Sequence, residues 1–162
     1  MNNFLLFNII GEINQNMEEK FSVFFERVVD NPGLPVLVNI NSCGGEYESV
    51  ISIYNMLTSI SDRLRCAITG RCSGFANLIF LAAPKERRFA FYYASMTISA
   101  ISDGPYISKN KELKDIFSNS FYLEDEVLND IFDNNAEYLI TRNKFIQYKI
   151  AGIVNHLNDI MC

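Results

Sequence analysis

Two glycine-containing segments carry the residues whose types and spacing could do chemistry. The segment NSCGG (residues 41–45) follows one β-branched run, and GRCSG (residues 70–74) follows the next. Adjacent glycines let backbone N–H groups approach a ligand closely, and a helix that follows adds partial positive charge at its N-terminus. Such a turn can form an anion nest of the kind that stabilises an oxyanion. The alternative is that the glycines only permit tight turns.

Nucleotide and metal chemistry fit these segments poorly. Residues 70–74 contain only two glycines, so they do not match GxGxxG, and they lack the Gly-Lys-Ser/Thr ending of a P-loop. The cysteines form no CxxC pair and have no histidine at ligand spacing, which predicts no metal and no cofactor. We expect free thiols in a reducing, cytoplasmic compartment. The four cysteines are Cys43, Cys66, Cys72 and Cys162.

Length and charge narrow the class of protein. A chain of 162 residues fits a single domain spanning 1–162. The net charge is −5 and no long basic run occurs, which argues against nucleic acid as a partner. The apolar run Phe4–Ile10 is too short to span a membrane and is not preceded by a basic segment, so we interpret it as a buried strand and expect no membrane partner.

The apolar pattern predicts alternating strands and helices. A capping box at Asn16 and Glu19 predicts the start of a first helix that ends near Asp30. The order strand–helix–strand implies crossover connections and a mainly parallel sheet covered by helices. The predicted strands are 4–10, 36–40, 65–69, 87–93, 96–99 and 150–154, with residues 70–74 as a turn. Further helices are predicted to follow residue 45 and to cover 75–83, 109–119 and 123–134.

Three segments together resemble the ClpP family of Clp protease proteolytic subunits. INSCGG, at the start of Ile40–Leu57, resembles the family's Ile-Asn-Ser-Pro-Gly-Gly, and Gly70–Ser99 aligns without a gap to its nucleophile turn, helix and following strand. Tyr138–Val154 resembles the closing segment, with Lys149 in place of a glycine. The resemblance implies an α/β fold of the ClpP/crotonase type, with a shortened helical handle at about 104–135.

The resemblance also locates the family's catalytic positions, and it implies that the serine and histidine positions are empty while the third keeps a carboxylate. It places the nucleophilic serine at Gly74, the histidine at Ser99 and the aspartate at about Glu137. It implies oxyanion and substrate contacts at Gly44, Gly45 and Phe75. The chain is therefore predicted to be a pseudo-peptidase that keeps the glycine turn and lacks the Ser-His-Asp triad.

Two other functions remain open at this point. Ser73, one position before Gly74, could be a displaced nucleophile of an active Clp-type serine endopeptidase. The only histidine, His156, follows the last predicted strand and is expected on the surface, so a base for Ser73 is missing. The third alternative is a crotonase-like module that binds a ligand at the Gly44 and Gly45 turn.

The resemblance implies rings, formed by this chain alone or together with intact ClpP-like subunits, and a groove for peptides. The apolar run Phe75–Ala83 is expected to be buried between neighbouring subunits. Few residues precede the first strand, which does not favour an axial loop that docks an AAA+ unfoldase.

Overall fold

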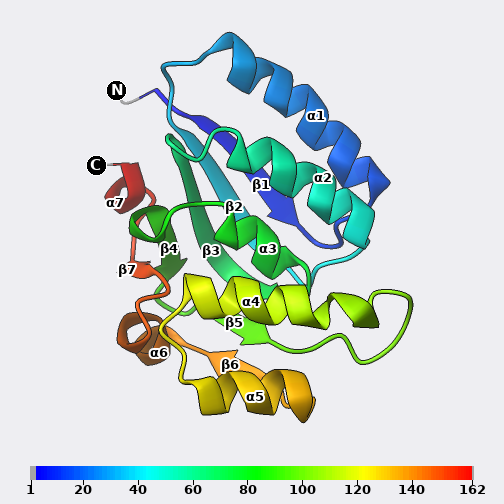
Figure 1. The fold of residues 1–162 in the computed structure, drawn as a ribbon. Coiled ribbons are helices and arrows are strands. Elements are labelled where there is room, and N and C mark those ends of the chain that lie inside the picture. The colour runs from blue at the N-terminus through cyan, green and yellow to red at the C-terminus, as the bar shows by residue number, and fades with distance from the viewer. Residues whose placement is uncertain (1–2, 162) are drawn as a thin grey trace.

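The structure is a computed structural model, describes residues 3–161 and is built on a seven-stranded sheet (Figure 1). The elements, in chain order, are β1 (Leu5–Ile10), α1 (Gln15–Asp30), β2 (Val36–Ser42), α2 (Tyr47–Thr58), β3 (Leu64–Ser73), α3 (Ala76–Leu81), the 3-10 turn η1 (Lys85–Arg87), β4 (Arg88–Phe91), β5 (Ser95–Ile98), the 3-10 turn η2 (Ile107–Lys109), α4 (Asn110–Ser120), α5 (Asp125–Asp133), β6 (Tyr138–Ile140), α6 (Arg142–Gln147), β7 (Gly152–Val154) and α7 (Asn158–Met161).

The sheet is mainly parallel, as predicted. Strands β1, β2 and β3 pair in parallel, and β4 and β7 continue the sheet in the order β1-β2-β3-β4-β7. The long strand β3 pairs with β4 in its first half and with β5 in its second half. Only β6 runs antiparallel, along β5. The carboxyl ends of β2 and β3 therefore lie close to β5 and β6.

Helix α1 packs its aromatic face on β1, but it starts two residues earlier than predicted. The Asn14 side chain accepts a hydrogen bond of 3.1 Å from the Met17 backbone N–H, which makes Asn14 the N-cap. The predicted capping box at Asn16 and Glu19 is therefore wrong. Phe21 contacts Phe7 of β1 edge to face, at a centroid separation of 5.0 Å.

The apolar run is buried inside its own chain from residue 76 to 83, and Phe75 before it is half-buried. Every residue of α3 is buried, and its Phe80 side chain is fully enclosed. The buried Arg88 guanidinium closes this region: its Nε donates to the Ala83 carbonyl at 2.7 Å and its Nη2 to the Leu81 carbonyl at 3.3 Å. The expectation that this run is buried between subunits is wrong, because α3 already packs in the core.

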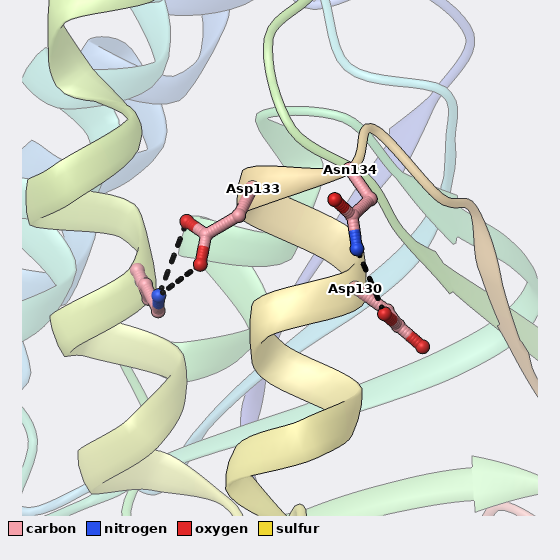
Figure 2. Close-up of polar contacts among 4 residues, drawn as sticks. Asp130, Asp133 and Asn134 are labelled. Atoms are coloured by element: carbon pink, nitrogen blue, oxygen red, sulfur yellow. Dashed lines mark hydrogen bonds and ion pairs between the residues drawn. The ribbon is translucent and has the colours of Figure 1, made fainter.

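Helices α4 and α5 lie side by side beyond α3, within the segment predicted as a handle (Figure 1). Leu113 of α4 and Ile131 of α5 are buried, so both helices belong to the core as well as to the surface. Figure 2 shows the outer contact, in which the Lys114 Nζ lies 3.2 Å from an oxygen of Asp133. Exposed ion pairs of this kind contribute at most about 1 kcal/mol, so apolar packing holds the two helices together. No helix within residues 3–161 is long and apolar enough to cross a membrane.

Candidate functional site

The segment 70–74 is not the turn that its glycines predicted. Strand β3 continues through Ser73, and Arg71 and Ser73 pair with Ser95 and Thr97 of β5. The turn into α3 is confined to Gly74 and Phe75. The backbone partners of residues 71–73 lie in β5, which is distant in the sequence, so the local pattern could not predict this pairing. The pairing extends β3 up to the site.

The three positions at which the resemblance implied the catalytic residues meet in one cleft of about 480 Å³. Gly74, Ser99 and Glu137 all line it. The register explains the meeting: Ile98, the last residue of β5, pairs with Tyr138, the first of β6, so Ser99 just after β5 and Glu137 just before β6 lie at the same end of this antiparallel pair. The structure therefore brings together three residues that are widely separated in the sequence. Cys43, Arg71, Ser73, Ser95, Thr97 and Leu139 complete the lining.

Backbone occupies the place where a nucleophile would project. Gly74 has φ of +57°, and a Cβ built on it would lie 2.6 Å from the Cys43 carbonyl oxygen. A separation below 3.0 Å requires the neighbouring backbone to move. In the observed arrangement, a serine side chain at residue 74 has no room.

The glycine pair at 44 and 45 is packed on both sides. The Gly44 N–H donates a buried hydrogen bond of 3.0 Å to the Ser42 Oγ, and a Cβ on Gly44 would lie 2.8 Å from the Phe75 nitrogen. Gly45 forms a parallel bridge to Ile13, whose carbonyl oxygen would lie 2.1 Å from a Cβ on Gly45. Close backbone packing therefore accounts for both glycines.

An exposed thiol also faces this cleft, and the sequence did not single it out as functional. The Arg71 Nη1 donates a hydrogen bond of 3.3 Å to the Cys43 Sγ. The pKa of the Cys43 thiol lies below its ordinary value. The main cause is this hydrogen bond from Arg71, and the second is a hydrogen bond with the Ser73 hydroxyl. Residues 43 and 71 are far apart in the sequence, so only the pairing of β2 with β3 shows their contact.

His156 lies outside the cleft. It is exposed in the turn before α7, where its backbone N–H donates to the Asp159 carboxylate at 3.0 Å. The next helix packs Ile160 in a cluster with Leu37, near the amino end of β2. The expectation of a surface position is confirmed, and the only imidazole in the chain does not line the cleft that holds Ser73.

An apolar pocket of about 210 Å³ opens beside Gly74 and shares Ser99 with the cleft. Phe75 and Leu78 form one wall, and Phe117 of α4 contributes to the other. The Phe75 ring stacks edge to face on Tyr47 at 5.1 Å. The pocket has the size and lining to hold one apolar side chain next to the cleft. Within residues 3–161, no group of three or more metal-ligating side chains gathers.

Comparison with known proteins establishes the family. The sequence profile described as Clp protease matches residues 6–137, which is most of the chain. The chain belongs to the Clp protease family. Its structure agrees: ClpP1 from Listeria monocytogenes superposes with a TM-score of 0.81 at 24% identity, covering 96% of this chain and 94% of that one. At this identity the superposition shows the fold, which is that of ClpP.

Curated Clp protease relatives match over shorter stretches. ATP-dependent Clp protease proteolytic subunit 1 of Chlamydia trachomatis serovar D is 32% identical over 78 residues, which cover 48% of this chain and 41% of the relative. Subunit 2 of Borreliella burgdorferi is 31% identical over 90 residues, covering 53% of this chain and 44% of the relative. The chain therefore aligns with less than half the length of these Clp proteins.

Proposed function

We propose that this Clp family member is a ring-forming pseudo-peptidase subunit that binds peptides without cutting them. The observation that carries the proposal is the Cys43 carbonyl oxygen, which lies where a side chain at Gly74 would begin, 2.6 Å from the ideal Cβ. Relatives are named proteolytic subunits. In this chain, no side-chain nucleophile is available at the matching position.

The other catalytic positions support the same conclusion. A serine hydroxyl attacks a peptide only when a base takes its proton, and Ser99 has no lone pair basic enough for that task at neutral pH. Glu137 lies beside Ser99 in the cleft but has no imidazole to orient. Loss of a nucleophile or base costs on the order of 10⁶ in turnover in well-studied serine peptidases.

Ser73 does not replace the missing serine in this geometry. It is half-buried on β3, and the polar groups nearest to it along the cleft include the Cys43 thiol and the Arg71 guanidinium. Neither of these groups is positioned as a base for the serine hydroxyl: a guanidinium has donors and no acceptor, and Arg71 already donates to the Cys43 thiol. The test is covalent labelling by a fluorophosphonate, and we expect none.

Peptide binding without hydrolysis rests on the parts of the site that remain open. The apolar pocket beside Gly74 can take a side chain, while the cleft next to it offers the hydroxyl groups of Thr97 and Ser99 as hydrogen-bonding partners for a backbone. Because binding needs no nucleophile, the apolar pocket and the cleft hydroxyl groups can hold a peptide in an inactive subunit.

Self-assembly rests on family membership and on the part of the second sheet face, along β1, that α7 leaves open. Helices α1, α2 and α3 cover the face that carries Phe7 (Figure 1). On β1, Leu6 and Ile10 point to the opposite face and are 38% and 65% exposed. An apolar edge strand open to solvent favours burial against another subunit.

We therefore expect light scattering at micromolar concentration to give a mass of several chains. Ile10→Lys should lower that mass because it places a charge on the open face. Val23→Lys is the matched control, since Val23 is equally exposed at 64% but lies on α1. A single-chain mass for the wild-type protein, without a partner, would contradict self-assembly.

A further inference from the structure

Cys43 differs from the other cysteines that the structure describes. Its side chain is exposed at the end of β2, whereas Cys66 and Cys72 are fully buried. Burial raises the pKa of the Cys66 thiol to about 12 and that of Cys72 well above its ordinary value. A buried thiol in apolar surroundings stays protonated and inert. Among the cysteines within residues 3–161, Cys43 is therefore the one placed to react as a thiolate.

The Arg71 guanidinium is fixed beside this thiol. The Arg71 backbone N–H donates to the Asn41 Oδ1 at 3.0 Å, and its Nη1 donates to the Cys43 Sγ at 3.3 Å. The two side-chain ion pairs within residues 3–161 join other residues, so no described carboxylate lies within ion-pair distance of Arg71. Its positive charge is therefore available to a thiolate and to an anion that approaches it.

Cys43 and Arg71 line two neighbouring hollows. One is the cleft of about 480 Å³ with Ser73 and Glu137. The other is a hollow of about 740 Å³ that Glu12 and Asn41 also line. Reagents can reach the Sγ from open space, and a group attached to it has room in either hollow. The carboxylates of Glu12 and Glu137 are the acidic groups along these two linings.

We propose that Cys43 is a site of covalent modification by low-molecular-weight disulfides, with Arg71 as the residue that stabilises its thiolate. The Sγ thiolate attacks one sulfur of the disulfide, a new Sγ–S bond forms as the S–S bond breaks, and the second sulfur leaves as a thiolate that takes a proton from water. The small disulfide supplies the oxidising equivalents. A further thiol reverses the step by the same exchange.

The attached group would lie in the cleft that the family positions line. It would cover Gly74 and restrict access along the route that a peptide needs. This modification does not depend on the absence of peptidase activity, so the two proposals can fail separately. Its consequence, a redox-controlled block of peptide binding, rests on the proposed function, whereas the modification itself does not.

Oxidised glutathione at neutral pH, followed by intact-mass measurement, tests the proposal. The protein carries Cys162→Ser, because residue 162 lies outside the described part of the chain. We expect one adduct, located at Cys43 by peptide mapping and absent from C43S. Arg71→Met should slow its formation at pH 7 about threefold or more and move the midpoint of the rate–pH curve upward. Arg71→Lys keeps the charge and should stay closer to wild type.

Two results would overturn the inference. The first is an adduct on Cys66 or Cys72, or no adduct at all, in folded protein. The second is an unchanged rate and midpoint in Arg71→Met, which would show a thiol that reacts without its guanidinium. Near-ultraviolet circular dichroism of each variant establishes that the fold is intact before the rates are compared.

Discussion

The double variant Gly74→Ser with Ser99→His is expected to react with a fluorophosphonate at least about a hundredfold faster than either single variant. The two positions line the same cleft, so the new hydroxyl and imidazole would share it once the Cys43 carbonyl has moved. A hydroxyl without a base, or a base without a hydroxyl, does almost nothing because triad members act as a unit. Full turnover is not expected, since Glu137 is one methylene longer than an aspartate.

The serine at residue 74 must first be accommodated. Its Cβ would meet the Cys43 carbonyl oxygen at 2.6 Å, and its φ of +57° disfavours a side chain. Overpacking of this kind costs about 1–3 kcal/mol, and the left-handed backbone about 1–2 kcal/mol more. The matched control is G74A/S99H, which has the same steric demand and no hydroxyl. Equal labelling of a folded G74S/S99H and this control would contradict the assignment of Gly74 and Ser99.

The variant Gly45→Ala is expected to lower the free energy of unfolding by about 3 kcal/mol or more. The Ile13 carbonyl oxygen would lie 2.1 Å from the new Cβ, and a parallel bridge holds the backbones of residues 13 and 45 together. Gly33→Ala is the matched control, because a Cβ there meets nothing within 4 Å. That control should change stability by less than about 0.5 kcal/mol.

Urea denaturation followed by circular dichroism measures both glycine variants. A Gly45→Ala protein as stable as Gly33→Ala would mean that residues 13 and 45 do not approach closely. Gly45 would then be free to act as a ligand-binding turn, as the sequence allowed.

Much of the fold followed from local patterns. The apolar runs predicted β1 and β2, and their order predicted parallel pairing with crossover helices. In the closing segment, Lys149 has φ of +51°, a backbone conformation in which glycine is the usual residue, so the resemblance to a family glycine at this position stays a prediction that the backbone suits. These features depend on residues close in sequence, which is why they could be predicted.

The errors arose where distant pairing decides the local structure. Gly70 suggested a turn, but the partners of β3 in β5 and β2 keep the strand extended to Ser73. Asn14 and Asn16 are both suitable N-caps, and the choice depends on how the chain leaves β1. The short strand β6 was not predicted, because three residues carry too little pattern. The contact of Cys43 with Arg71 has no sequence signature.

One measurement tests the central proposal most directly: intact-mass analysis of the wild-type protein after incubation with a fluorophosphonate, beside Ser73→Ala. A catalytically empty site predicts the unmodified mass for both proteins, because neither Gly74 nor Ser99 supplies an activated nucleophile. A phosphonylated wild-type protein, with the adduct on Ser73 and absent from Ser73→Ala, would contradict it. Such an adduct would show that this Clp family member is an active serine hydrolase with a displaced nucleophile.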